Sequence, residues 1–404
     1  MIFFSNPKVS SSALLSAHYE QTKQRIVSSN SKYILAIQDQ MYMDYSSHNA
    51  KTELGRIGKH GKQEQHGIIQ HNLLCITENN EPLGLMDINF FDNELFDTTK
   101  PRYERLLEEK ESYFWVKALK NMRQRLGATD KKIITIADRE SDFFELFHYF
   151  LEHKEDFVIR AKHNRAHGDD GNDKCPDGLF DSLKSMPKCG QMETIIQDVK
   201  TRETKEITLT LKAKSFTLGP SNKIKNRAEY GKIKLNAVVA YNDEHQWVLI
   251  TTLPIETEEN LKEIITLYKA RWHIEDFHKV LKTGYQVDEI YLHSSKETIL
   301  NMLAMAAISA CRLYWLIFIG RAENSIKANE VFEEFEWKAA YIYFKKSPPK
   351  EIPSVADVVA LIARMGGFKG KKKKLPGTKT LWIGYQKLTV AAEMLKNINS
   401  PILQ

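Results

Sequence analysis

The sequence predicts an α/β protein in which helices cover a mixed β-sheet, with a β-rich insertion domain and a helical C-terminal domain. Short apolar runs alternate with helical repeats over residues 32–162, which is typical of a sheet covered by helices. The pattern becomes β-like over residues 163–255 and helical from residue 256 onward. The 404 residues suffice for two or three domains with a sizeable core.

The chain is expected to open its sheet with a three-stranded meander. Three short apolar runs predict these strands, at Tyr33–Ile37, Leu73–Ile76 and Leu83–Ile88. The polar segment Glu78–Pro82 separates the last two runs and has the composition of a turn. Neighbouring strands joined in this way are expected to be antiparallel.

Alternating helices and strands are expected after the meander. Apolar residues recur at helical spacing over Ser112–Leu126, and Gly127 ends the repeat. A strand at Ile133–Ala137, a helix from Ser141 to about His153 and a strand at Phe157–Ala161 follow. The resulting order, β-β-β-α-β-α-β, is the one expected of an RNase H-like fold.

We divide the chain into five expected parts. Residues 1–31 form a short N-terminal arm, 32–162 and 256–320 the two parts of the RNase H-like core, 163–255 the β-rich insertion domain and 321–404 a helical C-terminal region. Four β-patterned segments define the insertion, at Thr194–Val199, Ile207–Leu218, Ile233–Tyr241 and Trp247–Leu253.

Composition excludes several classes of protein. A hydrophobic content of 42% and a charged content of 27% exclude a disordered chain. The net charge of +6 is compatible with a polyanionic partner without proving one. Four scattered cysteines and the start MIFFSNPK indicate a reducing, cytoplasmic setting without a secretion signal. Asn301 and Arg312 interrupt the apolar stretch up to Gly320, so a buried helix is expected there and no membrane contact.

Two aspartates follow the predicted strands at a place suited to metal binding. Asp39 comes after the first apolar run, and Asp138 directly follows Ile133–Ala137. If those strands are neighbours, the two carboxylates emerge side by side and offer the hard oxygen ligands that Mg²⁺ prefers. The alternative is that each aspartate only forms a turn or caps a helix.

A predicted helix from Glu258 to about Thr283 carries four functional groups on one face. They lie at offsets of 0, 3, 7 and 14 residues, within an arc of about 60° on an ideal helix: Tyr268, Arg271, Glu275 and Lys282. A solvated face with ion pairs would give a similar pattern. Trp272, Ile274 and Phe277 on the flanking faces favour a stripe that is partly enclosed.

The spacing Tyr268-x-x-Arg271-x-x-x-Glu275-x-x-x-x-x-x-Lys282 resembles the YREK signature of the IS-four family of bacterial cut-and-paste transposases. Three further segments resemble that family in the same order: Gln38-Asp39-Gln40 ahead of Asp44-Tyr45, then Ala137–Asp142, then Ile362–Phe368. The resemblance runs from about Lys32 to the C-terminus.

The resemblance implies a DDE transposase that cuts and rejoins double-stranded DNA at transposon ends. Asp39, Asp138 and Glu275 would form the triad that holds two divalent ions, with Mg²⁺ expected and Mn²⁺ able to substitute. The family pairs two chains through the C-terminal region, which implies a homodimer on DNA. Localisation would be the bacterial cytoplasm, at the nucleoid when the protein is bound to DNA.

The resemblance also assigns the DNA contacts. Tyr268, Arg271 and Lys282 would grip phosphates beside the cut, and Arg160 and Lys162 match a basic strand of the family that reaches the DNA backbone; for these two, ordinary surface cations are the alternative. Trp247 lies 21 residues before Tyr268, where the family places a tryptophan that supports a flipped base while a DNA hairpin forms. Simple core packing is the alternative for Trp247.

The N-terminus leaves a second function open. Only 38 residues precede Asp39, fewer than the helical end-recognition domain of the family plus a strand would need. The chain could therefore be a truncated regulator that pairs with a full-length transposase, unless residues 1–31 form a minimal recognition arm. Gly55–Lys62 is glycine-rich and basic but misses the spacing of a P-loop, and we expect a mobile loop that is able to touch phosphates. Lys369–Lys374 is expected to be a solvated run or a non-specific DNA contact rather than an address signal.

Overall fold

The computed structural model describes residues 3–47, 53–97, 99–169, 172–175, 178–197, 204–287, 295–320, 326–370 and 376–398. The chain forms two compact units. The sheet unit comprises Tyr19–Ser46 and Leu54–Ile274, and the helical unit comprises Met1–His18, Ser47–Glu53 and Glu275–Gln404. The division into the five parts named above remains a prediction from the sequence.

The sheet unit is organised around one large sheet, which contains twelve strands in the described part of the chain. They are β1 (Tyr33–Asp44), β2 (Arg56–His60), β3 (Gln63–Thr77), β4 (Pro82–Phe91), β5 (Lys132–Ala137), β6 (Asp156–Arg160), β7 (His167–Asp169), β8 (Asn172–Cys175), β9 (Gly190–Gln197), β10 (Thr204–Leu218), β11 (Ile233–Tyr241) and β12 (Gln246–Thr251). The order is β2-β3-β1-β5-β6-β12-β11-β10-β7-β8, with β4 beside β3 and β9 beside β10.

The sheet is mixed, as the sequence predicts. β1, β5 and β6 are parallel neighbours, and β3 and β4 extend the sheet as an antiparallel meander on the other side of β1. This arrangement confirms the RNase H-like fold class. The predicted insertion strands are present, but β12 pairs directly with β6, so β10, β11 and β12 continue the central sheet.

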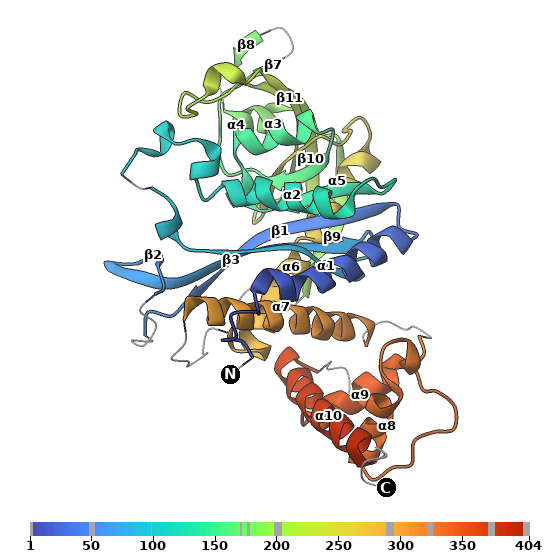
Figure 1. Cartoon of the computed structure of the whole chain (residues 1–404). Helices are drawn as coiled ribbons and strands as arrows, with labels where there is room; N and C mark the ends of the chain where they lie inside the picture. The colour runs from blue at the N-terminus through green and yellow to red at the C-terminus, as the bar shows by residue number, and fades with distance from the viewer. Residues whose placement is uncertain are drawn as a thin grey trace. The chain divides into compact units, whose positions relative to one another are not determined.

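Helices cover both faces of this sheet. α2 (Tyr113–Leu126) and α3 (Phe144–Glu152) lie side by side on one face (Figure 1). Trp115 of α2 and Phe147 of α3 belong to the main hydrophobic core. α5 (Glu258–Lys269) packs on the opposite face. Thr257 begins α5 with a capping box, in which its hydroxyl accepts from the Asn260 amide and the Asn260 side chain accepts from the Thr257 amide.

The sequence interpretation is wrong at two places in this unit. Gly55–Lys62, expected to be a mobile loop, forms β2 and the turn into β3. The helix that carries the four functional groups is not one straight α-helix. The amides of Ala270 and Arg271 bond three residues back, which separates α5 from α6 (Trp272–Lys279). The 60° arc calculated for an ideal helix therefore does not hold.

α1 (Ser11–Ser28) forms the N-terminal helix, and its second half packs within the sheet unit. Ile26 belongs to the main core, and the Arg25 guanidinium donates to the carbonyl of Leu83 at 2.8 Å. The Tyr19 hydroxyl accepts from the amide of Ile88 at 3.0 Å. This part of the chain thus supports β4.

The last segment of the helical unit begins at Glu275, within α6. In its described residues it continues with a π-helix, η6 (Val280–Gly284), and with α7 (Lys296–Ile319), α8 (Glu334–Tyr343), α9 (Val355–Met365) and α10 (Thr378–Ile398). α7 is long and apolar enough to cross a membrane by length and composition, but 56% of its apolar window is buried. It packs against η6, α9 and α10, as expected of a core helix. Most of Lys369–Lys374 lies outside the described residues.

Two glycines set the packing of α9 on α10. A Cβ atom at Gly366 would lie 1.8 Å from the carbonyl oxygen of Thr380, and one at Gly384 would lie 1.8 Å from that of Ile362. Only glycine permits such close approach of two backbones. This packing explains Gly366 in the segment Ile362–Phe368 that the sequence singled out.

The remaining elements are short. They are α4 (Leu179–Ser185) and the 3₁₀-helices η1 (Asn93–Leu95), η2 (Arg102–Glu104), η3 (Leu107–Glu109), η4 (Arg139–Ser141), η5 (Arg227–Glu229) and η8 (Ala328–Glu330).

Candidate active site

Asp39 and Asp138 occupy neighbouring positions on adjacent parallel strands. The β1–β5 ladder ends with Gln38 beside Ala137, and each aspartate is the next residue of its strand. Asp138 keeps an extended backbone, so both side chains emerge on the same face of the sheet. The sequence predicts that the first strand ends before Asp39. In the structure β1 continues past Asp39 to Asp44 and stays paired with β3. Neighbouring strands lie about 4.8 Å apart, which places the two carboxylates side by side.

Each carboxylate is held by one local hydrogen bond. The amide of Gln40 donates to Asp39 Oδ1 at 2.8 Å, and the amide of Glu140 donates to Asp138 Oδ1 at 2.9 Å. Arg271 Nη1 lies 3.5 Å from Asp39 Oδ2 and forms an ion pair with it. A cation therefore already lies beside one of the two carboxylates.

Three further predicted residues lie on the same face. The β5–β6 ladder ends with Ala137 beside Ile159, so Arg160 is the in-register neighbour of Asp138. Arg160 pairs with Leu249 on β12, two residues from Trp247, which therefore faces the same way. The rings of Trp247 and Tyr268 are 6.2 Å apart.

Tyr268 is enclosed in this arrangement. Its side chain is only 5% exposed, and burial raises the pKa of its hydroxyl above the usual value. The nearby guanidinium groups of Arg271 and Arg160 lower that pKa in part.

Asp142, which the sequence interpretation did not assign a role, fixes the segment after β6. Its buried carboxylate accepts from the amides of Lys162 at 2.6 Å and His163 at 3.1 Å, and it pairs with Arg165. The Arg165 guanidinium also donates to the carbonyl of Asp142 at 3.2 Å. Asp142 thereby ties the turn that follows Asp138 to the basic segment that contains Lys162. Its position four residues after Asp138 was visible in the sequence, but its partners were not.

The start of α6 differs from the expectation of an enclosed stripe. Ile274 is buried, but Trp272 is 56% exposed, and the Arg271 guanidinium lies 5.3 Å from the centre of its ring. Glu275 follows on α6, one helical turn after Arg271, and Lys282 lies in η6. Both residues belong to the helical unit.

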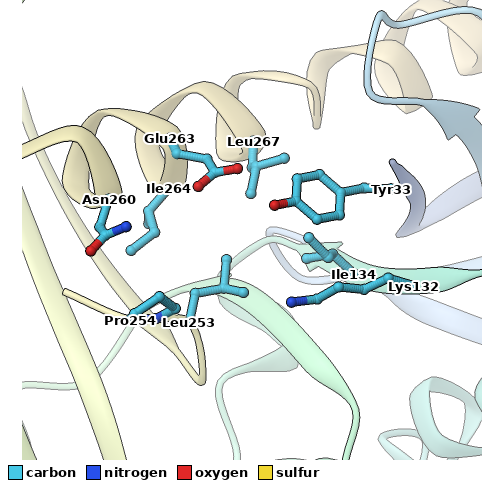
Figure 2. A pocket seen from close by; sticks show the side chains of 9 residues that line it. All are labelled: Tyr33, Lys132, Ile134, Leu253, Pro254, Asn260, Glu263, Ile264 and Leu267. Atoms are coloured by element: carbon cyan, nitrogen blue, oxygen red, sulfur yellow. The ribbon is translucent and has the colours of Figure 1, made fainter. Parts of the chain in front are cut away.

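A small pocket lies at the opposite end of the parallel strands, between α5 and the first residues of β1 and β5. Figure 2 shows the side chains of Tyr33, Lys132 and Glu263 around it, together with apolar residues such as Leu253. Tyr33 and Lys132 are the first pair of the β1–β5 ladder, whereas the aspartates follow its last pair. The pocket is therefore separate from the carboxylate pair.

Two family models match the chain. Residues 110–311 match the transposase DDE domain, and residues 308–400 match the transposase Tn5 dimerisation domain. The first match covers half of the chain. The chain belongs to the DDE transposase family. Asp138 and Glu275 fall within the matched DDE domain, and Asp39 precedes it.

DDE transposases use divalent metal ions, and the aspartate pair of this transposase has the chemistry to bind one. Both residues offer carboxylate oxygens, the ligand type that Mg²⁺ and Mn²⁺ prefer. The Arg271 guanidinium beside Asp39 Oδ2 shows that the position accepts positive charge. Within the described ranges, no group of three His, Cys, Asp or Glu side chains could hold a metal ion. A metal ion at this pair would therefore need further ligands.

Proposed function

We propose that this transposase cuts DNA at transposon ends and rejoins it elsewhere, as a member of the IS-four group with the YREK signature. The observation that supports this most is the in-register pair of Asp39 and Asp138, flanked on the same face by Arg160 and Arg271. Paired carboxylates beside paired guanidinium groups suit phosphodiester chemistry, which requires metal ligands and charge neutralisation together.

Asp39, Asp138 and Glu275 are the proposed metal ligands. Bound Mg²⁺, or Mn²⁺ in its place, would supply activation of the attacking oxygen and stabilisation of the leaving oxygen. The protein supplies the position of the carboxylates, fixed by the amides of Gln40 and Glu140. Arg271 forms an ion pair with Asp39, and a second cation beside Asp39 would let the guanidinium turn toward a DNA phosphate.

The remaining cations are proposed to hold the DNA backbone. Lys162 is exposed directly after β6, and Arg160 is half-buried with its guanidinium bonded to the carbonyl of Gln246 at 3.3 Å. Lys282 would add a further charge from η6. Tyr268 is buried, so its proposed role is to orient Arg160 and Arg271 rather than to contact phosphate over a large area.

Trp247 is proposed to support a flipped base during DNA hairpin formation. It is only half-buried and lies on the carboxylate face next to Tyr268, so part of its ring is available for stacking. Stacking of one base on an aromatic ring is worth about 1–3 kcal/mol, which offsets part of the cost of unstacking.

Dimerisation is proposed to use α10. Three of the most exposed apolar side chains lie at intervals of four residues on this helix: Val390 at 62%, Met394 at 61% and Ile398 at 64%. Such spacing forms one apolar stripe along a helix. A second copy of the chain, bound to the other DNA end, is the proposed partner. Light scattering of Val390→Glu/Met394→Glu with end DNA should show monomers where the unaltered protein forms dimers. A dimer of unchanged affinity would exclude α10 as the interface.

Cleavage of labelled end DNA in Mg²⁺ tests the proposed chemistry. Asp39→Asn, Asp138→Asn and Glu275→Gln are each expected to abolish nicking while DNA binding persists, because the basic surface remains. Asp130→Asn, an exposed aspartate just before β5, is the matched control and should nick normally. Near-normal nicking by any one of the three variants would remove that residue from the proposed ligand set.

A further inference from the structure

β2 and the first residues of β3 form a two-stranded ribbon that leaves the sheet. β2 pairs with Gln63–His66 of β3, whereas β1 pairs with β3 only as far as Gly67. Figure 1 shows this ribbon projecting from the sheet unit. We name residues 56–66 the basic β-arm. Its turn is tight, because Gly61 and Lys62 are the only residues between the paired His60 and Gln63, and Gly61 has φ +62°, as a two-residue turn requires.

The root of the basic β-arm is firmly packed. A Cβ atom at Gly67 would lie 1.9 Å from the carbonyl oxygen of Met43. The backbone of β3 is therefore in close contact with the backbone of β1 where the arm begins. Ile57 packs in a small hydrophobic cluster with Phe91 and Phe114, whose rings stack 3.9 Å apart. A rigid root lets the arm hold one direction relative to Asp39.

The outer part of the basic β-arm is exposed and carries positive charge. Lys59, His60 and Lys62 are all exposed. Glu64 is the acidic residue of the arm, and it lies 3.2 Å from Arg56 and 3.7 Å from Lys59. Lys62, at the turn, makes no ion pair among the residues that the structure describes. The arm therefore presents an excess of cations to solvent.

The length of the arm sets the distance at which it could act. Asp39 pairs with Asn72, and Gln63 at the turn lies nine residue positions before Asn72 along β3. At about 3.3 Å per residue, the tip lies about 30 Å from Asp39 along the strand direction. B-form DNA advances about 3.4 Å per base pair, so 30 Å corresponds to about nine base pairs. The major groove is wide enough for a two-stranded β-ribbon.

We propose that the basic β-arm is a second DNA contact, in which Lys59 and Lys62 bind backbone phosphates of the duplex about nine base pairs from the cut. The proposal rests on the proposed function, because it takes the position of the cut from Asp39 and Asp138. The arm would lengthen the bound duplex without reading its sequence, since phosphate contacts carry no base information.

Binding titrations with two lengths of end DNA test the proposal. One duplex extends twenty base pairs on each side of the cut, and two others are trimmed to five base pairs on one side or the other. Lys59→Gln/Lys62→Gln is expected to weaken binding to the long duplex and to lower the slope of log K against log salt by about 1.8, or about 0.9 per lost phosphate contact. It should bind one of the trimmed duplexes as the unaltered protein does, and hydroxyl-radical protection about nine base pairs from the cut should disappear.

Lys120→Gln/Lys154→Gln is the matched control. It removes the same charge from exposed positions on α2 and directly after α3, on the face opposite the carboxylates. The control should keep the salt slope and the footprint. An arm variant with an unchanged slope and footprint would overturn the proposal. Nicking by the unaltered protein in Mg²⁺ distinguishes a failure of the proposed function from a failure of the arm proposal. Absence of nicking would count against the proposed function. Normal nicking, together with an unchanged salt slope and footprint in the arm variant, would count against the arm proposal alone.

Discussion

Replacing Asp142 should loosen the segment that presents Lys162. The carboxylate accepts from the amides of Lys162 and His163 and pairs with Arg165, and its side chain is fully buried. A hydrogen bond to a charged group contributes about 1.5–3 kcal/mol, and breaking a buried ion pair by removing one partner costs about 3–5 kcal/mol. Arg165 remains slightly exposed, so we expect the low end of that range, about 3 kcal/mol, for Asp142→Ala.

Hydrogen exchange measures this effect locally. A loss of about 3 kcal/mol corresponds to roughly hundredfold faster exchange of the Lys162 and His163 amides. Asp142→Asn keeps an oxygen acceptor but loses the charge, so its exchange should accelerate by roughly tenfold. Asp181→Asn is the matched control, because Asp181 is exposed and its carboxylate accepts from the Asn164 side chain at 2.7 Å, away from the two amides. Unchanged exchange of the two amides in Asp142→Ala would refute the reasoning.

Three further predictions concern other parts of the chain. Trp247→Ala should nick the first strand but give less DNA hairpin on a denaturing gel, and an equal hairpin yield would return Trp247 to a packing role. Gly384→Ala should lower the free energy of unfolding of the helical unit by about 1–3 kcal/mol through overpacking, seen as a lower melting temperature, whereas Gly377→Ala, with open space around it, should leave the melting temperature unchanged. Burial raises the pKa of the Glu111 carboxyl in the folded protein. Below the unfolded pKa of about 4.3 the carboxyl is neutral in both states, and the folded protein keeps its full stability. As the pH rises through the raised folded pKa, the buried carboxyl must ionise and the free energy of unfolding falls. Glu111→Gln should therefore gain stability relative to the unaltered protein between pH 4 and pH 7 in urea titrations, and a constant difference would contradict the assigned burial.

The sequence predicts the sheet well where burial dictates residue type. The strands at Tyr33–Ile37 and Ile133–Ala137 are apolar because both faces are covered, and their order alone indicates an RNase H-like fold. Asp39 and Asp138 stand out for the same reason, as the first charges after apolar runs. Their alignment, however, depends on the register of the β1–β5 pairing, and neither segment's sequence predicts that register.

Other features depend on contacts between distant residues. The basic β-arm has polar and glycine residues in place of a strand pattern, and it is held in place by backbone pairing with β3 and by Phe91 and Phe114. The break before α6 has no proline or glycine to predict it, and the turn coincides with the ion pair of Arg271 with Asp39, more than two hundred residues earlier. Asp142 likewise takes its role from β6, which no local pattern reveals.

Mn²⁺ binding to the purified protein tests whether Asp39 and Asp138 hold the metal ion. The electron paramagnetic resonance signal of free Mn²⁺ counts the ions bound by the unaltered protein and by its variants. We expect saturable Mn²⁺ binding that Asp39→Asn and Asp138→Asn each weaken severely and that the control Asp130→Asn leaves intact. Undiminished binding by both Asp39→Asn and Asp138→Asn would show that the aspartate pair is not the metal site.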